Sequence, residues 1–228
     1  MRCSGLPATF GTLFNMRLSS IIASRHRSGS ESRDLEFTVD ASISTTLTIN
    51  LEASSSYSGT INWGDGSADT ALSGFPTSSS ISHTFTSSNI FQVKISGAAV
   101  PHVRFENQTN IISLQGMGDI GLLLSVNMFK ACTGIASVKT GSYITSIDDF
   151  TFFQCSGMTS AIIGSGVTYM GTSAFNQCPS LSSISCLAMS APGLGYHTFY
   201  GVPATTIQVP VGATGYGTTY GGLTVVYV

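Results

Sequence analysis

The chain has 228 residues and a formal net charge of −2, with 42% hydrophobic residues and only 9% charged residues. Soluble domains usually carry about 25% charged residues, and Ser, Thr and Gly take their place here. No apolar run approaches the ~18 residues that span a bilayer, and the low net charge argues against a general polyanion binder. The composition therefore indicates a β-rich protein with a neutral surface.

The first segment, residues 1–33, holds five of the nine Lys and Arg residues. Pro7 and Gly11 interrupt its apolar stretch, so it lacks the continuous hydrophobic region of a secretory signal. We expect a basic, poorly ordered tail. A short nucleic-acid-binding or membrane-surface arm remains the alternative for this segment.

Residues 34–98 contain short stretches such as TTLTINLEA and IFQVKIS, in which apolar and polar residues alternate. Together with the Asp-Gly turn in INWGDGS, this pattern predicts a small antiparallel β-sandwich. The segment resembles the polycystic-kidney-disease-type (PKD) domain, an immunoglobulin-like spacer or binding unit without a catalytic role. The resemblance is carried by Trp63, Asp65, Gly66, His83, Phe85 and Val93.

Residues 99–212 repeat with a period of 23–24 residues. Phenylalanine recurs with gaps of 24, 23, 23 and 24 residues, and other apolar positions keep the same register. A single coil of this length cannot bury its own apolar face, so successive coils must stack into a solenoid. The expected core consists of Phe105, Phe129, Phe152, Phe175 and Phe199, with Cys132, Cys155, Cys178, Ile111, Ile135, Met158 and Leu181.

The lines IDDFTFFQCSGMTSAII and MGTSAFNQCPSLSSIS resemble the BspA-like leucine-rich repeat family, and FYGVPATTIQVPVGATGY resembles its closing unit. The resemblance covers about residues 99–216. It implies a leucine-rich-repeat solenoid of about five coils, followed by a capping strand in residues 213–228. The expected fold class is thus mainly β, a PKD-like sandwich followed by a short solenoid.

The three repeat cysteines have no close second ligand of the C-x2-C kind that metal sites use. We interpret them as small buried core residues, with a disulfide pair or a metal site as open alternatives. Asp65 and Asp69 are weak candidates for calcium at an exposed turn. We expect no catalytic residues, no other metal site and no cofactor.

The expected function is binding without catalysis. Tyr196, Tyr200, Tyr216 and Tyr220 cluster near the C-terminus and form the candidate binding surface, and exposed Ser, Thr, Asn and Tyr suit wet contacts. The first hypothesis is a virion structural or decoration protein of a phage, assembled in the host cytoplasm. The alternative is an adhesin-type repeat protein at the bacterial cell surface, and a glycan-processing enzyme, which needs facing carboxylates, comes third. The expected partners are virion or cell-surface proteins or glycans, and a homo-oligomer is possible.

Overall fold

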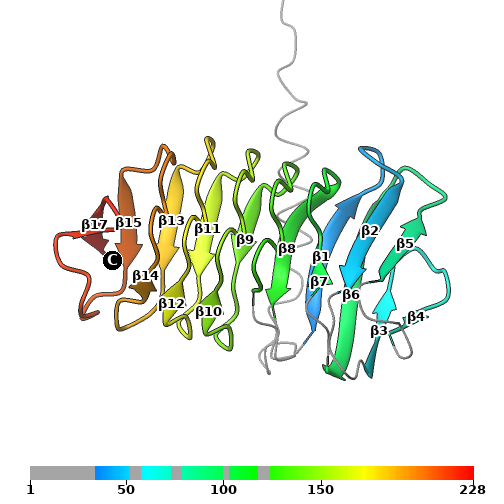
Figure 1. Ribbon diagram of the computed structural model, residues 1–228, viewed down its shortest axis with the longest axis horizontal. Helices are drawn as coiled ribbons and strands as arrows, with labels where there is room; N and C mark the ends of the chain where they lie inside the picture. The colour runs from blue at the N-terminus through cyan, green and yellow to red at the C-terminus, as the bar shows by residue number, and fades with distance from the viewer. Residues whose placement is uncertain (1–33, 52–57, 73–78, 100–102, 118–123) are drawn as a thin grey trace, which may run out of the picture. The chain divides into compact units, whose positions relative to one another are not determined.

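A computed structural model describes residues 34–51, 58–72, 79–99, 103–117 and 124–228 (Figure 1). The expected basic tail, residues 1–33, lies outside this part of the chain. The described residues form strands and turns and contain no helix, in agreement with the mainly-β prediction. It follows that none of them belongs to a helix that could span a membrane.

The first seven strands belong to two antiparallel groups. Residues alternate between buried and exposed positions along them, so that Leu47, Ile49 and Leu51 all point into the core. One group, β1-β6-β3-β4, ends the large sheet, and the other, β5-β2-β7, forms a sheet of three strands. The strands are β1 (Leu35–Asp40), β2 (Thr46–Leu51), β3 (Ser58–Asn62), β4 (Thr70–Ala71), β5 (Ser80–Thr84), β6 (Ile90–Ala99) and β7 (Val103–Arg104).

The repeats form a β-solenoid of about four turns. Five repeating Phe positions enclose four coil-to-coil steps, which explains why the number of turns is below the expected five. The main face consists of neighbouring parallel strands closed by the antiparallel β16. Its strands are β8 (Ile111–Met117), β9 (Ser137–Lys139), β11 (Ser160–Ile163), β13 (Ser183–Cys186), β15 (Thr206–Val209), β16 (Thr219–Tyr220) and β17 (Leu223–Tyr227). A second parallel face has β10 (Ser146–Ile147), β12 (Tyr169–Met170) and β14 (Gly193–Leu194).

The large sheet runs without a break from the first segment into the repeats. β1 pairs with β6 on one side and with β8 on the other, both antiparallel. Figure 1 shows the consequence, since the strands of both segments stand side by side in one row. Residues Ser32–Val228 form one compact unit, and the boundary expected near residue 98 falls at the end of β6, inside this sheet.

The repeated phenylalanines form one ring stack in the core. Successive ring centroids lie 5.2, 5.5, 5.2 and 5.6 Å apart, close to the spacing of adjacent strands. Four of the rings are fully buried and Phe199 is 5% exposed. Phe37 of β1 meets Phe105 edge-on at 5.0 Å, and Gly221 packs against Phe199 at the other end. The other expected core residues, Cys132, Cys155, Cys178, Ile111, Ile135, Met158 and Leu181, are also buried.

Each repeat unit turns around its Phe through a segment that runs from three residues before the ring to two residues after it. We call these stacked segments the turn column, and number the units one to five from Phe105 to Phe199. In units two to five, the residues two before and two after the ring adopt left-handed backbone conformations, for example Ala131 at a φ of 56° and Gly201 at 75°. Backbone N–H groups in the column donate to carbonyl groups of the next unit, as Phe152 does to Ala174 at 2.8 Å.

Replacing Ala131 by Gly should stabilise the protein by about 0.5–1 kcal/mol, because a left-handed conformation costs an L-residue with a Cβ more than it costs glycine. Gly201 already occupies the equivalent position in unit five. Urea denaturation measures the change. Ala136→Gly is the matched control: Ala136 does not have a positive φ, so this change should lower stability. A loss of stability in Ala131→Gly would contradict the conformation assigned to residue 131.

Candidate functional site

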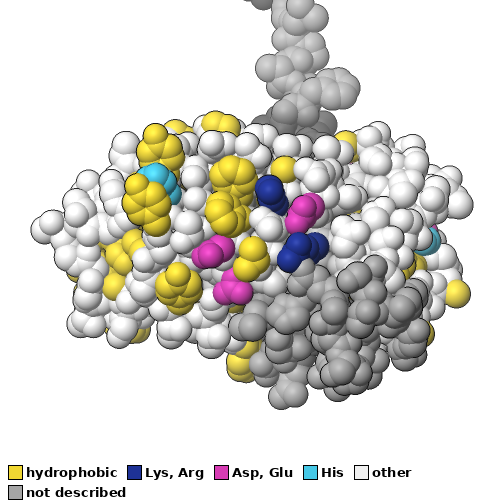
Figure 2. Space-filling model, in the orientation of Figure 1, with side chains coloured by type: hydrophobic (Ala, Val, Ile, Leu, Met, Phe, Trp, Pro, Cys, Tyr) yellow, Lys and Arg dark blue, Asp and Glu magenta, His cyan; other side chains and the backbone are white. Residues whose placement is uncertain are grey.

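Three aromatic side chains of unit five lie together on the surface. Tyr196 and Tyr200 are 73% and 62% exposed. The ring of His197 stacks between them, with centroids 3.7 Å from Tyr196 and 4.7 Å from Tyr200. Figure 2 shows this face, on which a histidine lies between hydrophobic side chains. We call Tyr196, His197 and Tyr200 the aromatic surface.

The structure corrects the other half of the predicted tyrosine surface. Tyr216 and Tyr220 are only 2% and 7% exposed, because both rings close the end of the solenoid core. The Tyr216 hydroxyl donates to the carbonyl of Ala188 at 2.8 Å, and that of Tyr220 donates to Pro192 at 2.7 Å. Burial raises the pKa of both phenols. Neither residue can contact a partner at the surface.

A second aromatic pair lies two units earlier in the turn column. Phe150 and Phe153 of unit three are half-buried and meet edge-on with centroids 5.6 Å apart. Between this pair and the aromatic surface, unit four presents the smaller polar residues Thr172 and Asn176. Sequence reasoning missed this arrangement because it followed only the inward positions. The signal was available, since Phe153, Asn176 and Tyr200 all directly follow the repeated Phe.

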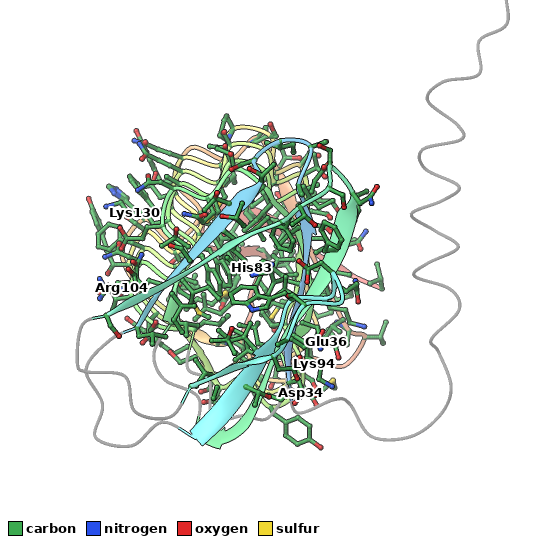
Figure 3. The ribbon with its side chains drawn as sticks, turned by 90° about the vertical axis from the view of Figure 1, so that its right-hand side faces the viewer. Asp34, Glu36, His83, Lys94, Arg104 and Lys130 are labelled. Carbon is green, nitrogen blue, oxygen red and sulfur yellow. The ribbon has the colours of Figure 1, made fainter. Side chains whose placement is uncertain are left out.

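Charge is distributed unevenly along the chain. Figure 3 shows Lys94 beside Asp34 and Glu36 on one side of the fold, and Arg104 and Lys130 on the other side. Lys94 contacts the Asp34 carboxylate at 2.5 Å, and Arg104 contacts Glu106 at 3.6 Å. From Phe150 to Val228, however, the sequence contains no Lys, Arg, Asp or Glu. The aromatic surface therefore lies on units without charged side chains.

The comparisons with known proteins identify the repeats. The family model of the BspA type leucine rich repeat region matches residues 105–219 in six copies. The chain belongs to the BspA-type leucine-rich repeat family. No curated protein and no solved structure matched the chain. Membership in this family indicates a surface or binding protein.

The cysteines of the BspA-type repeats are free thiols that serve the core. Cys132, Cys155 and Cys178 are fully buried. Each thiol donates to the carbonyl of the Phe in the preceding unit, at distances of 2.9 to 3.1 Å. The structure thus contains no disulfide among the four described cysteines, and the described residues hold no group of three potential metal ligands. This agrees with the interpretation as buried core residues.

These thiols should be unreactive in the native protein and should make it sensitive to alkali. Burial raises the pKa of Cys132 and Cys178 to about 12, whereas an unfolded cysteine titrates at about 8.5. Because the unfolded state loses these protons first, stability should fall as the pH rises from about 8.5 toward 12. Urea denaturation from pH 7 to pH 10.5 measures the decline, and Cys155→Ala should reduce it. Rapid native-state labelling by a thiol reagent at pH 8 would contradict this account.

The residues on which the resemblance to the PKD domain was based lie together between the two antiparallel groups of strands. The ring of His83 stacks on Trp63 at 4.4 Å, and its Nε2 lies 2.7 Å from Oδ2 of Asp65. Burial alone would raise the pKa of Asp65, but hydrogen bonds donated by Ser67 and the contact with His83 lower it to about 2. Phe85 and Val93 are buried nearby, and Gly66 adopts a left-handed conformation at the turn.

The candidate calcium pair has other contacts in the structure. Asp65 is held by His83 and Ser67, whereas Asp69 accepts a hydrogen bond from Asn62 at 2.7 Å. The two carboxylates thus stabilise their own turn. No third potential metal ligand joins them among the described residues.

Proposed function

We propose that this chain is a non-enzymatic, adhesin-type binding protein that recognises a ligand at a cell surface through Tyr196, His197 and Tyr200. The exposure of the two tyrosines is the observation that carries the proposal. Large rings exposed to water are available for a partner, and their short side chains lose little conformational freedom on binding. The ring stack beneath them supplies a rigid support.

The hydrogen bonds that the thiol and carboxylate side chains make within the protein support binding rather than catalysis. The buried thiols donate to carbonyl groups, and Asp65 is held by its neighbours. In the repeats, Asp148 accepts from Ser146 and Asp149 accepts from the backbone of Thr172. A glycan-processing enzyme would need a carboxylate pair placed on either side of a substrate, so we place this alternative last.

Family membership favours the cell surface over the virion. The repeat family is consistent with an adhesin-type protein and lends no support to a phage virion role. We therefore propose an extracellular or cell-surface location. The PKD-like segment would then act as a spacer, and its continuous sheet with the repeats would hold the aromatic surface at a fixed orientation.

A cell-binding assay tests the proposal. Fluorescently labelled protein is applied to mammalian epithelial cells, decellularised matrix, and Gram-positive and Gram-negative bacteria, and bound fluorescence is measured against concentration. We expect saturable binding to at least one surface, with a loss of at least about tenfold in Tyr196→Ala/Tyr200→Ala. Tyr143→Ala is the matched control, since Tyr143 is 52% exposed but lies outside the turn column. Equal binding by all three proteins, or no saturable binding, would overturn the proposal.

A further inference from the structure

We infer that the ligand is a neutral oligosaccharide, which lies across unit four from the Phe150–Phe153 pair to the aromatic surface and continues past unit five. This inference rests on the proposed function and adds the chemical class of the ligand. Four features support it: the spacing of the aromatic groups, the polar residues between them, the backbone donors of unit five, and the absence of cations.

The register of the turn column places the two aromatic groups on either side of unit four. The backbone N–H of Phe150 donates to the carbonyl of Thr172 at 2.9 Å, and the backbone N–H of Ser173 donates to the carbonyl of Tyr196 at 2.9 Å. Units three and five are thus two steps apart, which is about 10 Å at the spacing of adjacent strands. Figure 2 shows hydrophobic groups on this face that are separated by polar surface. This arrangement offers ring faces to two successive parts of an extended ligand.

Unit four supplies polar groups between the rings. Asn176 is 8% exposed, and its amide nitrogen donates to the Ser173 hydroxyl at 3.1 Å. Its amide oxygen is buried and has no hydrogen-bond partner in the described part of the chain. A Cβ on Gly201 would lie 4.0 Å from this oxygen, and glycine leaves that position empty. A buried acceptor without a hydrogen-bond partner destabilises the protein. A ligand hydroxyl that donates to this oxygen would therefore stabilise the complex.

Unit five supplies backbone donors. In units three and four, the N–H groups at the Phe and at the residues two before and two after it all donate to the next unit. The equivalent groups in unit five belong to His197, Phe199 and Gly201, and no backbone carbonyl of a described residue accepts from them. Because each N–H group in the column points toward the following unit, these three point away from unit four. Only a ligand that continues past the aromatic surface reaches them, and it must offer acceptors in succession. Sugar oxygens can do so, whereas a β-strand alternates donors and acceptors along its edge.

The absence of cations argues against an acidic ligand. Acidic glycans are recognised through Lys and Arg, and neither occurs after Lys139. The two carboxylates next to Phe150 accept hydrogen bonds within the protein, Asp148 from Ser146 and Asp149 from the backbone of Thr172. Aromatic rings beside amide, hydroxyl and backbone polar groups suit a ligand with apolar C–H faces and many hydroxyls. A neutral sugar chain combines both properties.

Calorimetric titration of the full chain with defined hexasaccharides tests the inference. The neutral set comprises β-1,4-glucose, α-1,4-glucose and β-1,4-xylose oligomers, and the acidic set comprises galacturonate and heparin-derived oligomers. We expect binding to a neutral oligomer, with an affinity that is unchanged from about 0.05 to about 0.5 M NaCl. Tyr200→Ala and Phe153→Ala should each weaken it at least about tenfold, and Tyr143→Ala should not. Binding to acidic oligomers alone would overturn the inference.

Cell binding separates this inference from the proposed function. Periodate oxidises the vicinal hydroxyls of surface glycans, and protease removes surface proteins. We expect periodate treatment of the cells to abolish binding that depends on Tyr196 and Tyr200. If protease abolishes this binding and periodate does not, the partner is a protein; the inference then fails and the proposed function stands. If the cells do not bind the labelled protein at all, the inference and the proposed function both fail.

Discussion

Replacing Phe152 by Ala is expected to lower the free energy of unfolding by about 3–5 kcal/mol. Phe152 is fully buried and is the central ring of the stack, between Phe129 at 5.5 Å and Phe175 at 5.2 Å. Its removal leaves a cavity that backbone hydrogen bonds between units prevent from closing. It also removes two stacking contacts, each worth about 0.5–1.5 kcal/mol beyond burial. Denaturation in urea, followed by circular dichroism, measures the loss.

Two further variants separate the ring stack from general hydrophobicity. Phe152→Leu keeps most of the buried volume, so it should cost less than Phe152→Ala. Phe153→Ala removes a half-buried ring outside the stack and should cost about 1 kcal/mol or less. An unchanged midpoint for Phe152→Ala would refute the repeat register on which the solenoid depends.

Replacing Trp63 by Ala is expected to cost a similar amount, about 3–5 kcal/mol. Trp63 is 1% exposed, stacks on His83 and donates through Nε1 to the Thr70 hydroxyl at 2.9 Å. Trp63→Phe keeps a ring against His83 and loses mainly the hydrogen bond, so it should cost less. The same urea denaturation compares the two variants.

The shape of the Trp63→Ala transition also tests whether the sheet is continuous. Because β1 pairs with both β6 and β8, loss of the Trp63–His83 contact should destabilise the repeats as well, in a single transition. Two separate transitions, with the second at the wild-type midpoint, would contradict the continuous sheet. They would support instead an independent domain that ends near residue 98.

The inward half of the repeats could be predicted from the sequence, because burial imposes a strict spacing. Phe and Cys recur with the period of one coil, and both sets of side chains lie in the core. The strand of the last unit is displaced by one residue relative to its Phe, since Ser185 pairs with Gln208 and Ile207 and Val209 lie in the core.

Other features depend on contacts that composition does not reveal. Left-handed conformations at Ala131 and Phe150 could not be expected from those residue types, since the hydrogen bonds between units impose them. Tyr216 and Tyr220 looked like surface residues because tyrosine suits both environments. Their hydroxyls become buried only because β16 and the residues just before it place them over the carbonyl groups of Ala188 and Pro192. The pairing of β1 with β8 joins strands far apart in sequence, and no local pattern records it.

The most direct measurement of recognition by the last unit is an NMR titration of the isotopically labelled protein with the oligosaccharide that binds best. The account predicts that the backbone N–H signals of His197, Phe199 and Gly201 shift together and saturably, along with the side-chain amide of Asn176. Signals from the segment of residues 34–98 should not move. Shifts confined to that segment, or to the outer face of the parallel sheet, would contradict it.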